Sequence, residues 1–293
     1  WIKQFKLLDS NRKLIQVKVE DLQSQRKKLS EEYGKLKSSG DDTANLKDHI
    51  DEINNDLKKA SHELDKILES LNVFLLDIPN IPHTSCPIGE DEAANVVIKK
   101  YGSVNPARNI DHLSITNEID TDMATKIAGP RFAVLKGDMA KLQRSLISLM
   151  LDTAIKNGYQ EYYVPYMANK DSLTGVGQLP KFEEDLFKTT DGLYLIPTAE
   201  VPLTNIYRDV LINESELPIK LTAHTPCFRS EAGSYGRDTK GLIRQHQFEK
   251  IELFKITDPS SSMSELERLL TNSEEILQLL ELPYQVVQLC AGD

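Results

Sequence analysis

The chain has 293 residues, of which 40% are hydrophobic and 27% charged, as is typical of a globular protein and not of a disordered or fibrous one. Its formal net charge of −10 argues against a protein that coats nucleic acid with an overall basic surface. The three cysteines lie far apart, at Cys86, Cys227 and Cys290, so the sequence predicts neither a zinc motif nor a disulfide framework and favours the cytoplasm. No apolar run approaches the roughly 18 residues of a membrane span, so no membrane contact is expected.

The first 75 residues predict a helical hairpin. It contains two runs of regularly spaced apolar residues. Successive members are seven positions apart in the first run and alternately four and three positions apart in the second, which is the heptad pattern of a coiled coil. The first run is Leu8, Ile15, Leu22, Leu29 and Leu36, and the second is Leu46, Ile50, Ile53, Leu57, Ala60, Leu64, Ile67 and Leu71. A polar turn around Gly40 separates them. We therefore expect an antiparallel two-helix coiled coil over residues 1–75.

Charge is distributed unevenly between this arm and the rest of the chain. Residues 1–72 contain 14 basic and 14 acidic residues, whereas the remainder contains 21 basic and 31 acidic residues. Lysines and arginines gather at outer positions of the helices, namely Arg26, Lys27, Lys28, Lys35, Lys37, Lys58 and Lys59. A solvated coiled-coil exterior is one explanation of this basic face, and a local RNA-binding surface is the other.

Two prolines in Leu76–Pro82 end the second helix, because proline cannot continue it. We expect a linker over residues 76–104 and a larger domain over residues 105–293. Within that domain, Arg131–Gly137 predicts a short strand, and Asp138 is a candidate N-cap for the helix that follows. The helix should end near Asn157.

Two segments of the domain have only generic interpretations when they are read alone. Gly158–Met167 predicts a strand after the helix, with Pro165 at an edge or bulge position. Leu193–Pro197 predicts a short strand, after which Thr198 could cap a helix whose first turn holds Glu200.

The stretch Cys227–Ile256 predicts a β-hairpin with a polar face. Side chains alternate between the faces of a strand, so Arg229 and Glu231 should share one face. On the second strand, one face carries His246, Phe248, Lys250, Glu252 and Phe254, while Ile251 and Leu253 should turn toward the core. Alternation alone also fits a merely solvated sheet.

The order of residues in this hairpin resembles motif 2 of class II aminoacyl-tRNA synthetases, and in detail that of the seryl-tRNA synthetase family. The matching residues are Arg229, Ser230, Glu231, Gly233, Arg237, Asp238, Gly241, Leu242, Ile243, Arg244, His246, Gln247 and Phe248. Residues 158–167 resemble motif 1, and Thr198–Glu200 resembles the serine-binding loop. The resemblance implies an α+β fold, in which the N-terminal antiparallel two-helix coiled coil is followed by an antiparallel β-sheet domain flanked by helices.

The resemblance also implies a function, namely activation of serine with ATP and its transfer to tRNA(Ser), and possibly to tRNA(Sec). Arg229 would be the catalytic residue, bridging the serine carboxylate and the α-phosphate. Serine would contact Thr198, Ala199, Glu200, Arg229 and Glu252. ATP would contact Arg229, Ser230, Glu231, Gln245, His246, Gln247 and Phe248. Mg²⁺ would accompany ATP, with no metal ligand provided by this chain.

Further partners follow from the same resemblance. The arm would contact tRNA, the loop Ala232–Ile243 would approach the acceptor end, and motif 1, at about residues 138–167, would build a homodimer. Motif 3, a Gly-rich element with a second arginine, has no counterpart up to Asp293, so we expect a piece that ends before it and lacks activity alone. The alternatives are an inactive paralogue or fragment that binds tRNA or protein, a coiled-coil interaction module, and a threonyl-, prolyl- or glycyl-specific relative.

Overall fold

The computed structural model describes residues 1–104, 110–232 and 241–293, which form two compact units, Trp1–Asn80 and Ile81–Asp293. Within these ranges, no helix combines the length and the apolar character needed to cross a membrane.

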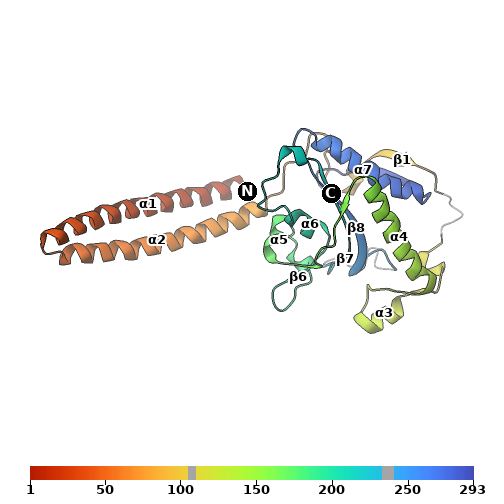
Figure 1. Cartoon of the computed structure of the whole chain (residues 1–293), viewed down its shortest axis with the longest axis horizontal. Helices are drawn as coiled ribbons and strands as arrows, with labels where there is room; N and C mark the ends of the chain where they lie inside the picture. Colours follow the sequence, from red (N-terminus) through yellow and green to blue (C-terminus); the bar gives the residue numbers. More distant parts are fainter. Residues whose placement is uncertain (105–109, 233–240) are drawn as a thin grey trace. The chain divides into compact units, whose positions relative to one another are not determined.

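The first unit is a hairpin of two long helices, α1 (Ile2–Ser39) and α2 (Ala44–Leu76), which lie side by side (Figure 1). Val19 of α1 packs against Leu57 and Ala60 of α2 in a buried seam. These positions belong to the heptad pattern or its interleaved positions, so the predicted helical hairpin is confirmed.

Gly40 closes α1 with a φ of 80°, a left-handed conformation that glycine adopts at little cost. Its N–H donates to the carbonyls of Leu36 and Lys37, which satisfies the end of the helix. Asp42 then accepts a hydrogen bond from the N–H of Ala44, at 2.9 Å, as α2 begins. The polar turn is therefore held by its own local hydrogen bonds.

The second unit is built around a long antiparallel strand pair, β7 (Ile219–Phe228) and β8 (Gln247–Ile256). β4 (Gln160–Glu161) joins β7 in parallel, which gives the order β4-β7-β8. Helix α4 (Gly137–Lys156) packs against β7 and β8, and α6 (Glu200–Asn205) contacts β8. The other α-helices in the described part of this unit are α3 (Thr121–Ala128), α5 (Lys170–Gly175) and α7 (Ser262–Leu279).

Shorter strand pairs surround this centre. They are β1 (Val96–Tyr101) with β9 (Tyr284–Gln288), β2 (Ile119–Asp120) with β3 (Val134–Leu135), and β5 (Met167–Ala168) with β6 (Tyr194–Leu195), all antiparallel. Leu173 of α5 and Ile196, which directly follows β6, are fully buried in one apolar cluster. A second cluster places Leu203 of α6 against Leu221 and Ala223 of β7. These clusters fix the β6–α6 loop next to the central strands.

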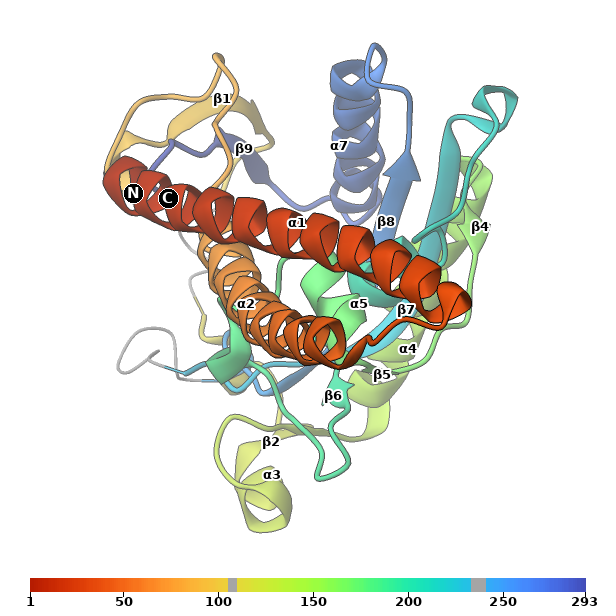
Figure 2. The same cartoon turned by 90° about the vertical axis from the view of Figure 1, so that its left-hand side faces the viewer.

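The segment expected as a linker contains the strand β1, which pairs with β9 from the far end of the sequence (Figure 2). The rings of Tyr101 and Tyr284 stack with their centroids 5.1 Å apart at one end of this pair. Four of the six residues of β1 are β-branched or aromatic, a composition that favours a strand once a partner is available. That partner lies almost 200 residues away, roughly the separation of Val96 and Gln288, so local sequence could not reveal it.

Two boundaries differ from the expected ones. The N-cap of α4 is Lys136 and the helix begins at Gly137, so Asp138 lies in its first turn. The strand expected over residues 158–167 consists of two short pieces, β4 and β5, with Pro165 between them. Because proline has no N–H to donate, it interrupts the pairing at that point.

Candidate active site

The register of β7 and β8 determines which side chains share a face. Phe248 lies opposite Cys227, Lys250 opposite Thr225, and Glu252 opposite Ala223. Directly paired residues point to the same side of a sheet, so all six belong to one face. The predicted alternation along the second strand is confirmed for Phe248, Lys250 and Glu252.

Arg229 follows the last residue of β7 and is held at both its backbone and its side chain. Its N–H donates to the carbonyl of His246 at 3.0 Å, and its own carbonyl lies 2.9 Å from Nδ1 of His246. The guanidinium carbon is 5.1 Å from the centroid of the Phe248 ring, which is a cation–π geometry. The ring therefore supports a fixed cation on the polar face of the hairpin.

A second polar group lies on the same face, where the β6–α6 loop meets β8. The hydroxyl of Thr198 donates to Oε2 of Glu252 at 2.7 Å. Nζ of Lys250 lies 2.7 Å from that hydroxyl and 2.6 Å from the same Oε2. We call Thr198, Lys250 and Glu252 the hydroxyl–ammonium–carboxylate cluster. It joins residues that are 52 and 54 positions apart in the sequence.

Glu200 lies next to this cluster, in the first turn of α6. Its N–H donates to Oγ1 of Thr198 at 3.1 Å, so Thr198 makes a capping contact although the N-cap residue is Ala199. Partial burial of the Glu200 carboxyl raises its pKa, because the charged form loses contact with water. The Glu252 carboxylate raises this pKa further, and the Lys250 ammonium lowers it. The residue as a whole is nevertheless exposed to solvent.

The residues after Arg229 are tied to the turn at Glu183–Asp185. The N–H of Ser230 donates to the Asp185 carbonyl, and the N–H of Ala232 donates to Oδ1 of Asp185, both at 2.9 Å. The Ser230 hydroxyl donates to the carbonyl of Glu184. Three hydrogen-bond donors of this segment are therefore paired with protein acceptors, and they hold the chain in a fixed path.

Glu231 and Arg244 form an ion pair across the base of the motif 2 loop, with Nη1 3.3 Å from Oε2. Glu231 has a φ of 50°, which is costly for a residue with a Cβ. Arg229, Glu231 and Arg244 line a cavity of about 410 Å³ together with Thr198. The structure thus brings Thr198 and Glu231 to the same cavity as Arg229.

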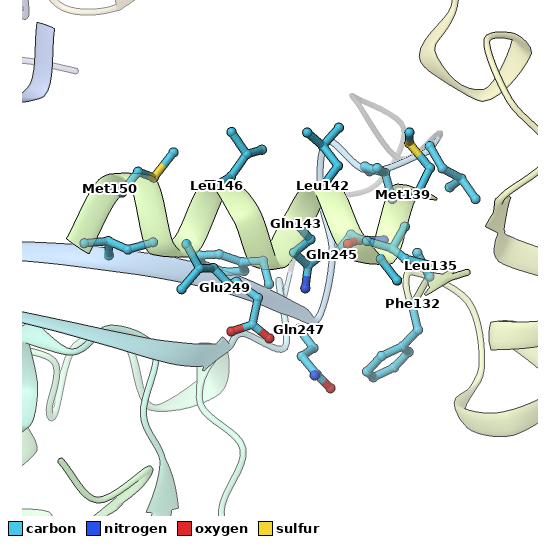
Figure 3. Close-up of a pocket in the computed structure, with 17 residues that line it drawn as sticks. Phe132, Leu135, Met139, Leu142, Gln143, Leu146, Met150, Gln245, Gln247 and Glu249 are labelled. Atoms are coloured by element: carbon cyan, nitrogen blue, oxygen red, sulfur yellow. The ribbon is translucent and has the colours of Figure 1, made fainter. Parts of the chain in front are cut away.

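Gln245 and Gln247 do not line the cavity that contains Arg229. Both line a groove of about 580 Å³ between α4 and β8, beside Gln143, Leu142 and Leu146 of α4 (Figure 3). His246 lies between them, and its ring packs against Phe132 and Phe187 with centroids 5.4 and 5.9 Å away.

Ile251 also lines the groove against α4, on the face opposite Glu252, and both Ile251 and Leu253 remain only half-buried. Gly233, Arg237 and Asp238 of the motif 2 string lie outside the described residues, as does most of the loop Ala232–Ile243.

Sequence reasoning missed three contributors to this region. Lys250 was placed on the polar face but given no role, although its spacing of two from Glu252 was a usable signal. Arg244 belongs to the motif 2 string, although no role follows for it there. Asp185 has no such signal, because its partner Ala232 lies 47 positions away in the sequence. In chemical terms, the face offers a fixed guanidinium beside an aromatic ring, with two carboxylates nearby. Such a set can bind a ligand that carries an anion, an ammonium group and a flat base.

Comparison with known protein families agrees with this chemistry. Residues 2–82 match the seryl-tRNA synthetase N-terminal domain, and residues 181–293 match the class II tRNA synthetase core domain (G, H, P, S and T). A serine–tRNA ligase of Hydrogenovibrio crunogenus is 50% identical over 98% of this chain and 70% of its own length. One from Francisella philomiragia is 51% identical over 100% of this chain and 71% of its own length.

Solved structures give the same result. The seryl-tRNA synthetase of Pyrococcus horikoshii, complexed with ATP, superposes with a TM-score of 0.85 at 32% identity, covering 100% of this chain and 71% of that one. The cytoplasmic serine–tRNA ligase of Naegleria fowleri, in complex with AMP, has a TM-score of 0.78 at 29% identity, covering 99% and 68%. With the helical hairpin, the strand register and these relatives agreeing, the chain belongs to the seryl-tRNA synthetase family of class II aminoacyl-tRNA synthetases.

Proposed function

We propose that the polar face of β7 and β8 is the place where serine and ATP react, in a protein that acts as a serine–tRNA ligase. The observation that carries this proposal is the shared face of Arg229, Phe248 and Glu252, with Thr198 hydrogen-bonded to Glu252. The product of the first step would be seryl-adenylate, and the seryl group would then pass to tRNA(Ser).

Arg229 is the catalytic residue in this proposal. Activation requires the serine carboxylate to attack the α-phosphate of ATP, so two anions must be brought together. A guanidinium can donate to both of them at once, and Phe248 and His246 hold the Arg229 side chain and backbone in place. The carboxylate is already a nucleophile, so no general base is needed.

Serine would be recognised by the residues at the β6–α6 junction. Glu252 would accept a hydrogen bond from the serine hydroxyl, and Glu200 would bind the ammonium group. The backbone and hydroxyl of Thr198 and the fully buried Ala199 would form the wall between them. A site that hydrogen-bonds a hydroxyl rejects the analogue that lacks it, because the buried acceptor is left unpaired.

ATP would lie along the start of motif 2. Phe248 would stack on the base, and Glu231 and the backbone of Ser230 would contact the adenine edge. Glu231 is paired with Arg244 in this structure, so adenine would have to share or replace that bond. We include Gln245, His246 and Gln247 in the proposed ATP site as well. Because the two glutamines line the groove against α4, they would act on ATP through neighbouring residues and not by direct contact.

Mg²⁺ belongs to the proposal only as a companion of the ATP phosphates. Among the described residues no group of three or more His, Cys, Asp or Glu side chains comes together, so they do not fit a protein-held metal site. Magnesium bound to a nucleotide takes its ligands largely from phosphate and water. We therefore assign no step of the reaction to the ion.

Three further parts of the proposal concern partners and location. The exposed basic residues Arg26–Lys28 of α1 support tRNA contact by the arm. Large apolar side chains exposed along residues 138–167, such as Leu142, Ile155 and Tyr163, support a homodimer interface there, which sedimentation of the purified protein would test. The three free cysteines support a reducing compartment such as the cytoplasm.

The deciding experiment is serine-dependent exchange of pyrophosphate into ATP by the full-length protein, followed by charging of tRNA(Ser). We expect exchange to be much faster with serine than with alanine or threonine. Charging of tRNA(Sec) is tested in parallel. Absence of exchange, with tRNA binding retained, would instead establish the alternative of an inactive tRNA-binding relative.

A further inference from the structure

The side chain of Lys250 connects the two halves of the proposed serine pocket. Its ammonium group lies 2.7 Å from Oγ1 of Thr198, on the β6–α6 loop, and 2.6 Å from Oε2 of Glu252, on β8. About a third of the side chain is exposed, at 32%, while that of Glu252 is 19% exposed. Water therefore screens this charge pair only in part, and the contact is short enough to be a charge-assisted hydrogen bond.

The hydrogen bonds of the Thr198 hydroxyl are fully assigned by this arrangement. A hydroxyl has one proton to donate and two lone pairs to accept with. Oγ1 accepts from Lys250 and from the N–H of Glu200, at 2.7 and 3.1 Å, and it donates to Glu252 at 2.7 Å. The rotation of the hydroxyl is thus fixed by its neighbours, and Lys250 supplies one of the two donors.

The Glu252 carboxylate is held by one oxygen. Oε2 accepts from both Thr198 and Lys250, while within the described ranges Oε1 has no hydrogen-bond donor from the protein. An ionised carboxylate has room for about four hydrogen bonds, so Oε1 keeps its capacity to accept from a ligand. The two short contacts to Oε2 set the direction in which Oε1 faces.

Charge balance gives a second reason for an ammonium at this position. Glu200 and Glu252 lie close enough for the Glu252 carboxylate to raise the pKa of Glu200, and Lys250 acts against that rise. Without Lys250, the two carboxylates would repel each other, and one of them would take up a proton more readily. A protonated carboxyl at either place would be a poorer partner for a serine hydroxyl or ammonium.

We propose that Lys250 is a positioning residue for serine recognition, whose ammonium fixes Oε2 of Glu252 and the Thr198 hydroxyl so that Oε1 accepts the hydroxyl of the substrate. This inference rests on the proposed function and deepens it, since it assigns the preference for serine over alanine to three residues and not to Glu252 alone. Lys250 itself does not touch the reacting atoms.

The test compares Lys250→Met with the wild-type full-length protein in pyrophosphate exchange. Lys188→Met is the matched control, because Lys188 forms an exposed ion pair with Glu183, 3.2 Å long, and makes no contact with the cluster. We expect the KM for serine to rise roughly 10- to 100-fold in Lys250→Met, as for loss of a charge-assisted hydrogen bond. The KM for ATP should stay within about twofold, and the ratio of serine to alanine activation should fall.

A merely structural role would give a different result. It would lower kcat or the unfolding midpoint and would affect serine and ATP alike. Lys250→Arg keeps a cation on a side chain of similar reach, so it should recover part of the serine KM and of the discrimination against alanine. It also provides a folded variant if Lys250→Met is unstable.

Two outcomes would overturn the proposal. One is an unchanged serine KM in both variants of an active enzyme, and the other is an equal loss for serine and ATP. Wild-type protein without serine-dependent exchange would refute the proposed function itself, so the two failures are distinguishable.

Discussion

Replacement of Glu252 by glutamine tests the proposed serine site most directly. The side chain keeps its size, so α6 and β8 should keep their packing, but the negative charge disappears and one oxygen becomes an NH₂ donor. Oε2 now accepts two short hydrogen bonds, of 2.7 and 2.6 Å, from Thr198 and Lys250. The amide oxygen would be drawn to these donors, which turns the NH₂ group toward the position of Oε1.

The size of the effect follows from what Oε1 would lose. A hydrogen bond to a charged group contributes about 1.5–3 kcal/mol, which corresponds to a factor of about 10 to 150 in kcat/KM. Serine should lose activity by this factor, whereas alanine has no hydroxyl and should lose little. The KM for ATP should change less than about twofold. Glu252→Ala should show the same selectivity with a larger loss, because it also leaves Lys250 without its carboxylate.

The assay is pyrophosphate exchange by the full-length protein, with serine varied at saturating ATP and then ATP varied at saturating serine. Glu249→Gln is the control, since Glu249 occupies the opposite face of β8 and pairs with His224 at 2.7 Å. Its serine KM should match that of the wild type. Equal increases in the KM for serine and for ATP in Glu252→Gln would refute the role given to Glu252.

Three other variants or conditions test separate parts of the structure. Arg229→Ala should abolish serine-dependent exchange while leaving the unfolding midpoint nearly unchanged, and retained exchange would remove Arg229 from the catalytic role. The kcat/KM for serine should fall as the pH is lowered, with a midpoint above the usual glutamate value of 4.5, because burial and the Glu252 carboxylate raise the pKa of Glu200. Protonated Glu200 no longer attracts the serine ammonium, so the same pH change should alter ATP binding much less; an acidic limb at or below 4.5 would contradict this. Lys255→Met should lower the free energy of unfolding by about 3 kcal/mol in urea, because it breaks a buried ion pair with Glu265, 2.9 Å long, whose side chains are each 4% exposed. A loss below 1 kcal/mol would show that the pair is replaceable.

The sequence was most informative where structure depends on neighbours along the chain. The helical hairpin follows from heptad spacing, since residues such as Leu57 and Ala60 fall on one side of a helix whatever else the protein contains. Strand β8 follows in the same way from a period of two, which placed Lys250 and Glu252 on one face. The first strand of the expected hairpin was wrong, because β7 ends at Phe228 and leaves Arg229 and Glu231 beyond it. Both periodicities are properties of the backbone, so the side chains reveal them without a tertiary structure.

The tertiary structure decided which of these side chains meet. Thr198 and Glu252 are 54 residues apart in the sequence. Nothing in the local sequence indicates that the β6–α6 loop places the Thr198 hydroxyl within hydrogen-bond distance of Oε2 of Glu252. The same is true of Asp185, which holds the backbone of Ala232, and of Gln245 and Gln247, which lie in the groove against α4. The motif 2 string indicated the chemistry of the site, because residue types set what can be bound. The position of each donor and acceptor came from the packing of distant segments, since hydrogen bonds depend on distances of tenths of an ångström that spacing along the chain does not specify.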